Sequence, residues 1–184
     1  MRRRLFAVSS IALPILFPWL VQHRLWAANI RDHIEAVRRK APVAYVGVVR
    51  EVNELSRSKL AIRARATIRV LNVPRAPAGR NPAEAALEYS SYDDRTPPLE
   101  GGPQYRLERG TMVLVFTDSF NSAAPPGYVL QGAEADLLRQ VDVLRQRTAQ
   151  LSDAQLKFNE ITEADRQVQV ELYDKVSAFL RSTK

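Results

Sequence analysis

The stretch 42–74 limits most strongly what this chain can fold into. It opens with an apolar run rich in β-branched residues at 43–49 and, after a polar turn at 56–59, continues as an alternating segment at 61–70. The first run predicts a strand buried on both faces, and the alternation predicts a strand with one apolar side. Gly47, inside the first run, is typical of a bulge or a tight bend. Together the two segments predict a long hairpin that the rest of the chain has to cover.

The alternating segment has one apolar and one basic face. Ile62, Ala64, Ala66, Ile68 and Val70 point one way, and Arg63, Arg65, Thr67 and Arg69 point the other. We call Arg63, Arg65 and Arg69 the arginine ladder, and two interpretations of it stay open. In the first it binds an acidic ligand, with Tyr45 or Tyr89 stacking against that ligand. In the second it is a solvated face paired with carboxylates such as Glu51, Glu54 or Glu88.

The net charge of +7 at first suggests a polyanion as the ligand. Four of the basic residues, Arg2, Arg3, Arg4 and Arg24, lie in an N-terminal segment without acidic residues. From Ala28 onward the chain has 23 basic and 20 acidic residues, a net charge of +3. This excess is too small for a dedicated binder of nucleic acid.

The N-terminal segment has the order of a signal peptide. A charged start at 1–4 precedes an apolar stretch at 5–21, and Ala27 is a small residue suited to a signal peptidase. An uncleaved anchor in the inner membrane is the alternative, because the residues at 22–24 are unusually polar for a cleavage region. Both interpretations place the body of the protein outside the cytoplasm, as a periplasmic or secreted protein if cleavage occurs. The chain has no cysteine, so core packing alone must hold the exported domain together.

The pattern after residue 27 predicts a short helix, a series of strands and two further helices. A helix is expected from Asn29 to about Arg39, strands at 43–49, 61–70, 85–92, 111–117 and 127–132, and loops at 74–82, 93–103 and 118–127. Apolar stripes predict helices from Ala133 to about Thr148 and, after a capping-box-like start at Thr162, to about Arg181. The second stripe consists of Ala164, Val168, Leu172, Val176, Phe179 and Leu180, and Phe158 and Ile161 are expected to pack between the helices.

These elements predict an α+β fold. No crossover helix separates the strands, so we expect a small antiparallel OB-like β-barrel of five to six strands, with the short N-terminal helix and the two C-terminal helices packed on it. The helices explain why the strands at 43–49 and 111–116 are apolar on both sides. The expected organisation is a signal peptide or anchor at 1–27, a barrel domain at 28–132 and a helical extension at 133–184.

The order of several segments resembles a known group of proteins. These segments are the run 43–49, a long second strand ending at Leu71, a variable loop and the stretch from Leu107 to Phe116. The group consists of the secreted OB-like barrels of the tissue-inhibitor-of-metalloproteinase and netrin-module type. The resemblance covers residues 43–131 and implies a five-stranded barrel used for binding. Protease inhibition is not implied, because those inhibitors chelate zinc through an N-terminal cysteine, which this chain lacks.

The sequence offers little for catalysis. His33, the one histidine after residue 27, has no second ligand at helical spacing and is better interpreted as a surface residue. Asp93, Asp94 and Glu100 could serve a two-carboxylate hydrolase, but a proline-rich loop is poorly suited to holding carboxylates in a fixed geometry. We therefore expect no enzyme, no catalytic residue, no metal and no cofactor.

The leading functional hypothesis is a non-catalytic exported binding or assembly domain that recognises a protein partner in the cell envelope through the barrel loops. The second hypothesis is an OB-like binder of an acidic polymer, which uses the arginine ladder with Tyr45 and Tyr89. An anionic glycan suits this second hypothesis better than single-stranded nucleic acid, because the protein is expected to be exported. The third hypothesis is the hydrolase. Membrane contact is expected only if the N-terminal segment stays attached.

Overall fold

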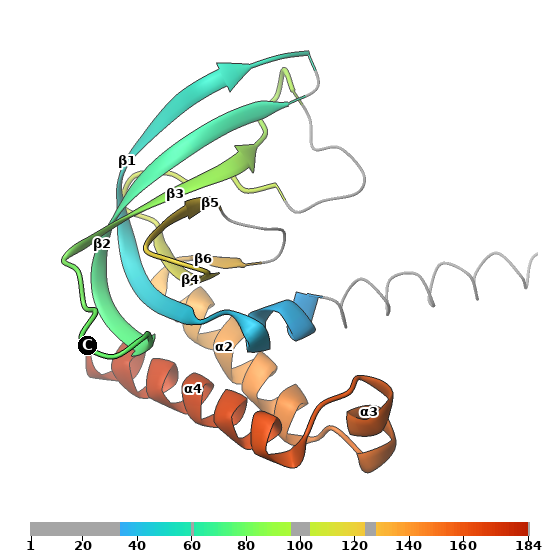
Figure 1. The fold of residues 1–184 in the computed structure, drawn as a ribbon. Coiled ribbons are helices and arrows are strands. Elements are labelled where there is room, and N and C mark those ends of the chain that lie inside the picture. Colours follow the sequence, from blue (N-terminus) through green and yellow to red (C-terminus); the bar gives the residue numbers. More distant parts are fainter. Residues whose placement is uncertain (1–33, 60, 97–103, 124–127, 184) are drawn as a thin grey trace, which may run out of the picture. The chain divides into compact units, whose positions relative to one another are not determined.

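The computed structural model describes residues 34–59, 61–96, 104–123 and 128–183, with the backbone alone for Ser122 and Ala123. Residues 34–40 are helical. The further elements are β1 (Val43–Arg57), β2 (Ile62–Arg75), β3 (Glu84–Ser91), β4 (Met112–Thr117), β5 (Asn121–Ala123), β6 (Val129–Gly132), α2 (Glu134–Ala149), α3 (Asp153–Phe158) and α4 (Glu163–Ser182) (Figure 1). The expected helix start at Asn29, His33 and the whole segment 1–27 lie outside the described residues.

One sheet and its covering helices confirm the mixed α+β class. The strand order is β5-β3-β2-β1-β4-β6, and every neighbouring pair is antiparallel except β3 and β5. In a flat sheet of this order β4 and β5 would lie about 19 Å apart. Residues 118–120, the whole connection between them, span at most about 14 Å. The sheet therefore has to curl, and Figure 1 shows β1 and β2 strongly bent.

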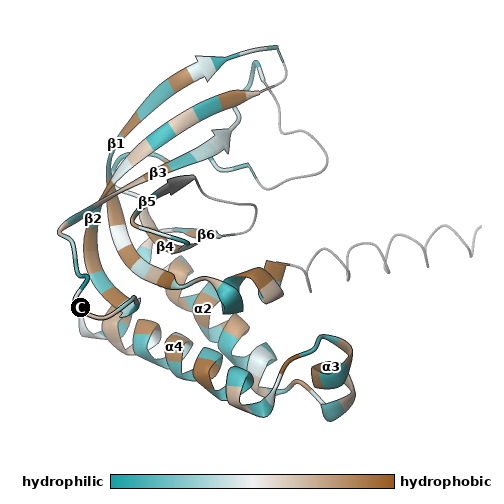
Figure 2. Cartoon of the chain, viewed as in Figure 1, coloured by the Kyte–Doolittle hydropathy of each residue, from teal (hydrophilic) through white to brown (hydrophobic). Residues whose placement is uncertain are grey.

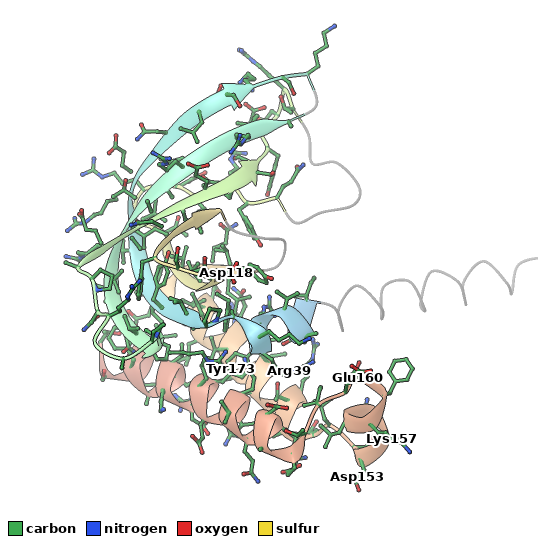
Figure 3. All side chains as sticks on the ribbon, viewed as in Figure 1. Arg39, Asp118, Asp153, Lys157, Glu160 and Tyr173 are labelled. Atoms are coloured by element: carbon green, nitrogen blue, oxygen red, sulfur yellow. The ribbon has the colours of Figure 1, made fainter. Side chains whose placement is uncertain are left out.

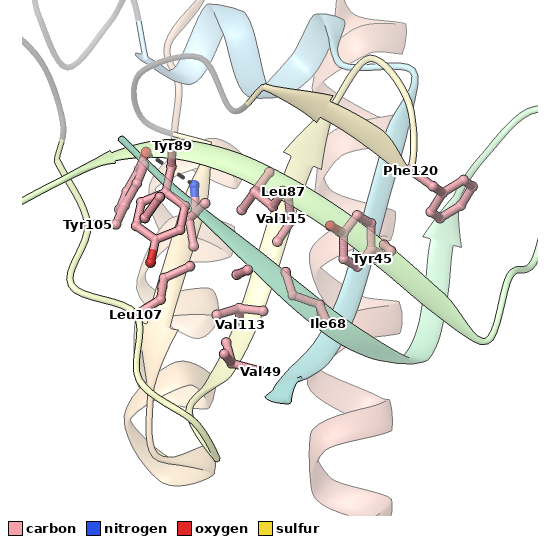
Figure 4. Close-up of a cluster of buried hydrophobic side chains, with 14 of the residues drawn as sticks. Tyr45, Val49, Ile68, Leu87, Tyr89, Tyr105, Leu107, Val113, Val115 and Phe120 are labelled. Carbon is pink, nitrogen blue, oxygen red and sulfur yellow. Dashed lines mark hydrogen bonds between the residues drawn. The ribbon is translucent and has the colours of Figure 1, made fainter. Parts of the chain in front are cut away.

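Apolar side chains fill both sides of the central strands. Tyr45, Ile68, Leu87, Val113 and Phe120 belong to one buried cluster on the inner face of the curled sheet (Figure 4). A second cluster joins the other face of β1 and β4 to α2 and α4 and contains Val46, Leu114, Phe116, Leu137, Val141, Tyr173 and Val176. The double burial expected for the strands at 43–49 and 111–116 is thus confirmed, because the helices cover the face that the curl leaves outside (Figure 2).

The expected closed barrel is not formed among the described residues. No hydrogen-bonded pairing there joins β6 to β5, so the sheet stays open between its two ends. Side chains occupy the outer edge of β6: the Tyr105 hydroxyl accepts from the Val129 N–H at 3.4 Å, and Gln140 Nε2 donates to the Gln131 carbonyl at 3.0 Å. These bonds satisfy backbone groups that closure would have used for another strand.

The strands differ from the sequence prediction mainly in length. β1 and β2 extend to Arg57 and Arg75, beyond the expected limits of the two runs, because the hairpin pairs along almost its whole length. The register shifts between Val46 and Gly47, which confirms the irregularity expected at this glycine. The expected loop at 118–127 contains β5, a three-residue strand that pairs with β3. No local sequence pattern predicts this pairing.

The two long C-terminal helices were placed correctly, but α3 was not predicted and the buried face of α4 was only partly right. The capping box at Thr162 is confirmed, with Asp165 as the reciprocal partner. On α4 the expected residues Leu172, Val176 and Leu180 are buried, whereas Val168 is 55% exposed and Ala164 is also exposed. The buried stripe includes Gln169, Tyr173 and Ser177 instead, since α4 turns these polar residues toward hydrogen-bond partners on β2, in the helical residues 34–40 and on α2, respectively.

The short helix α3 occupies the expected break between the two long helices. Ser152 caps its start through a capping box with Gln155. Leu156 and Ile161 are buried, the latter as expected, but Phe158 is 78% exposed, so the expectation that it packs was wrong. Because Leu156 already faces the core, a residue two positions further along the helix points away from it.

Candidate functional site

The arginine ladder lies on the exposed outer face of the hairpin. Arg63 and Arg65 both bind Glu88 on β3, the former with 3.1 Å between Nη2 and Oε2 and the latter through Nε and Nη2 to Oε1. The hydrogen bond from Arg65 holds the pKa of Glu88 below its usual range. Arg69 faces Glu84 in the β2–β3 register. Of the carboxylates expected as partners, Glu88 is therefore one, whereas Glu54 binds Arg57.

The charges on this outer face are balanced. Glu84 and Glu88 oppose Arg69 and Arg65 directly, and Glu51 on β1 opposes Thr67, the polar residue between them. The three arginines of the ladder thus share their face with three carboxylates. Such a face offers little attraction for an acidic polymer, which needs cations without local counter-charges.

The two tyrosines expected to stack on a ligand are buried in the inner cluster. Tyr45 has no exposed surface and packs on Phe120 with ring centroids 5.6 Å apart, and Tyr89 packs on Tyr105 at 6.2 Å. Burial raises the pKa of both, to about 12 for Tyr89. Tyr89 shares the face of Leu87 on β3, opposite to Glu88 and the arginine ladder. The structure therefore does not bring the tyrosines and the ladder together on one surface.

Two of the loop carboxylates considered for a hydrolase, Asp93 and Asp94, are each paired with a different arginine. Asp93 binds Arg57 at 2.8 Å and accepts from the backbone N–H groups of Arg95 and Thr96. The Arg57 hydrogen bond lowers the pKa of Asp93, which opposes the protonated form that a general acid needs. Asp94 is almost fully exposed and lies 3.6 Å from Arg106. Glu100 lies outside the described residues.

A polar junction that sequence reasoning missed lies at the end of β2. Arg75 donates from Nη1 to the carbonyls of Arg38, Arg39 and Ala41 at 3.0 to 3.2 Å, and from Nη2 to Gln169 Oε1 at 3.0 Å. One guanidinium thus ties the C-terminal end of the helical residues 34–40 to β2 and α4. All four acceptors are neutral oxygens, and burial lowers the pKa of Arg75.

A second contact joins the same elements beside Arg75. Tyr173 of α4 points toward the helical residues that carry Arg39 (Figure 3) and donates to Glu35 Oε2 at 3.5 Å. Burial, and after it the charge of Glu35, raises the pKa of Tyr173. Arg38 in turn donates to Glu35 Oε1 at 2.9 Å. Residues 34–40, β2 and α4 therefore meet at a fixed junction, and the surface next to it is held in place.

A groove of about 590 Å³ opens next to this junction, between the end of β2 and α4. Its apolar lining includes Leu71, Val73 and Pro74 from β2 and Val168 and Leu172 from α4. The three β2 residues are half-buried and Val168 is 55% exposed. The exposed lining as a whole is mostly polar, and a concave surface that mixes polar groups with partly exposed apolar side chains is a candidate for contact with another protein.

The charged lining of the groove is predominantly positive. It consists of Arg75, Arg80 and Lys175 against the single acid Glu171. Within the described part of the chain no ion pair involves Arg80, Lys175 or Glu171, and the hydrogen bonds of Arg75 go to neutral oxygens. Unlike the arginine ladder, the groove therefore holds more cations than acids, three against one.

The described residues contain no group of three or more histidine, cysteine or acidic side chains placed to hold a metal ion. None of the described helices combines the length and the apolar character needed to cross a bilayer. Comparison of the chain with known protein families, with curated proteins and with solved structures finds no match. The geometry and chemistry of the groove therefore have to carry the functional conclusion.

Proposed function

We propose that this chain is a non-catalytic binding domain, exported from the cytoplasm, that recognises a protein partner through the groove between β2 and α4. The observation that carries the proposal is one concave surface that combines partly exposed apolar side chains with an excess of cations. Protein interfaces typically pair an apolar centre with a charged rim in this way.

The junction at Arg75 supports a binding role for the groove. The hydrogen bonds of Arg75 fix the end of β2 relative to α4, so these two parts of the lining are held before a partner arrives. A surface that is already ordered loses little conformational entropy on binding. This differs from the expectation that loops of a barrel recognise the partner, and it moves the proposed docking surface to a strand and a helix.

An acidic polymer is the less suitable ligand. The arginine ladder faces Glu51, Glu84 and Glu88, and the predicted stacking residues Tyr45 and Tyr89 lie in the core. A polymer would need a long row of cations, whereas the groove offers three within a partly apolar surface. A protein segment can use both the apolar and the charged parts of the groove.

The test is site-specific photo-crosslinking in the cells that produce the protein. A photoreactive residue at Val168, inside the groove, is expected to capture a discrete protein partner. The same residue at Ser90, which is exposed on β3 but does not line the groove, is expected to capture none. Adding Arg80→Glu and Lys175→Glu to the Val168 variant should abolish the adduct. A Val168 probe that yields no adduct, or the same adducts as Ser90, would refute the proposal.

Export is tested separately. The mass of the mature N-terminus, measured together with the cell fraction in which the protein is found, distinguishes a cleaved signal peptide from an anchor. We expect a chain that begins near Ala28 in the periplasmic or secreted fraction. An intact Met1 in a cytoplasmic fraction would contradict the proposed compartment but not the proposed role of the groove.

A further inference from the structure

We infer that the groove binds an extended, acidic segment of the partner, which adds as a strand to the open edge of β2 at Leu71–Arg75. The inference rests on the proposed function and names the chemistry of the partner at that site. Its three supports are an unpaired strand edge, the protection of the other edges and the charge of the groove.

The edge of β2 is open where the groove lies. β3 pairs with β2 only from Ile62 to Arg69, and one further bond links the Val70 N–H to the Ala83 carbonyl at 2.9 Å. Beyond it, among the described residues, β2 has β1 as its single strand partner as far as Arg75. The connection 76–83 leaves β2 instead of pairing with it, and the residues from Leu71 to Asn81 line the groove together.

Other edges of the sheet carry protection of their own, whereas the end of β2 has Pro74 and irregular pairing with β1 but no side chain bound to its edge. Tyr105 and Gln140 bind the outward backbone groups of β6. β1 beyond Val49 has two register shifts, one before Glu51 and one before Ser56. Bulges and blocked backbone groups are the usual means by which proteins prevent unwanted strand addition. The edge of β2 at 71–75 lines the groove and keeps carbonyl groups that can accept hydrogen bonds from an added strand.

Pro74 takes one N–H donor away from this edge, so an added strand would depend on the carbonyl groups there. Proline has no N–H to donate, so within a sheet it is tolerated where that position faces away from the paired neighbour. The carbonyl groups of the edge remain available as acceptors. An extended peptide has free backbone N–H groups that can reach such acceptors, whereas a helix has already used its own. The strand edge therefore favours an extended occupant over a helical one.

The charges of the groove select among extended segments. Arg80 comes from the connection after β2, Lys175 from α4 and Arg75 from the end of the strand, so different parts of the lining supply cations. Acidic side chains on the added strand would meet these cations, with only Glu171 opposing them. Basic segments would be repelled, so the sign of charge gives specificity as well as attraction.

The experiment selects peptides from a displayed library of random dodecamers against the purified protein. We expect enrichment of sequences that alternate apolar and polar residues and carry at least two acids. A synthetic peptide from the selection should bind about tenfold more weakly to the Arg80→Glu, Lys175→Glu variant. The matched control is Arg109→Glu, Lys157→Glu, which changes the same charge at exposed residues outside the groove and should leave the affinity unchanged.

Amide hydrogen exchange and the NMR shifts of the bound peptide then decide its conformation. Slowed exchange in residues 71–75 together with extended shifts in the peptide supports strand addition. A peptide that binds the groove as a helix overturns this inference and leaves the proposed function standing. Crosslinking at Val168 combined with a selection that yields no groove-dependent peptide also overturns it. Failure of the crosslinking at Val168 overturns the proposed function and this inference with it.

Discussion

Replacement of Gly47 by alanine tests how closely β2 approaches β1 at this position. A Cβ atom placed on Gly47 would lie 2.4 Å from Ile68 Cγ2 and 2.6 Å from the Arg69 carbonyl oxygen. Real Cβ atoms essentially never approach other heavy atoms to less than 3.0 Å. The side chain of Ile68 is itself fully buried, and the carbonyl belongs to the backbone of the neighbouring strand, so neither can move aside easily.

The expected cost follows from these two contacts. Overpacking of a well-packed core by one methyl group costs about 1–3 kcal/mol, and the cost rises when backbone has to shift. We therefore expect Gly47→Ala to lower the free energy of unfolding by about 3 kcal/mol. For a domain of this size the melting temperature should then fall by roughly 6–12 °C. This is a large part of the total stability of a typical domain.

Denaturant and thermal unfolding monitored by circular dichroism measure the effect. In a double-mutant cycle, Ile68→Ala removes Cγ2 and should recover about 1 kcal/mol of the Gly47→Ala cost, while the contact with the Arg69 carbonyl remains. Gly110→Ala is the control: its φ of 89° is strained for alanine, but no atom lies near the added Cβ, so it should cost about 1–2 kcal/mol without coupling to Ile68. A Gly47→Ala protein as stable as the wild type would refute the close approach of β2 to β1 at Gly47.

Two further predictions concern the end of α3 and the arginine ladder. Glu160, labelled in Figure 3, has a φ of 52°, and the N–H groups of Ile161 and Glu160 donate to the Leu156 and Lys157 carbonyls in a Schellman motif. Glu160→Gly should therefore raise the free energy of unfolding by about 1 kcal/mol, whereas Glu160→Ala should not. A loss of stability in the glycine variant would contradict the left-handed backbone. Since the pKa of Glu88 is lowered in the folded state, its ion pairs favour folding above the unfolded pKa and lose this effect as the pH falls through the lowered value. An NMR titration should find the Glu88 midpoint below that of a model peptide, and Arg65→Gln should raise it; a midpoint insensitive to Arg65 would show that the pair is not formed in solution.

Local sequence patterns were sufficient to predict elements with one buried face and elements whose start is marked by a capping motif. The alternation at 62–70 predicted which side of β2 faces the core, and Ile62, Ala64, Ala66 and Ile68 are buried as expected. The capping box at Thr162 marked the start of α4, because its hydrogen bonds form within four neighbouring residues. Burial on both faces of β1 and β4 also followed from the sequence, since an apolar run without alternation needs cover on two sides.

The stripe on α4 shows where such patterns fail. Val168 has the spacing of the apolar stripe yet lies in the groove, whereas the polar residue Gln169 is buried. The spacing of apolar residues cannot predict that a polar side chain will form a hydrogen bond with a partly buried residue such as Arg75. The same holds for Tyr45 and Tyr89: stacking on a ligand was considered from residue type, and the curl of the sheet placed both rings in the core.

The sequence by itself determined the α+β class, most of the strands and helices, and the inward face of the hairpin, because these depend on contacts between near neighbours and on periodic burial. The tertiary structure alone decided that the sheet stays open and that a groove forms beside β2. Arg75 and Gln169, whose bond holds the walls of that groove together, are 94 residues apart in the chain. Their meeting depends on how the whole sheet curls and packs on α4, which no local spacing of residues encodes.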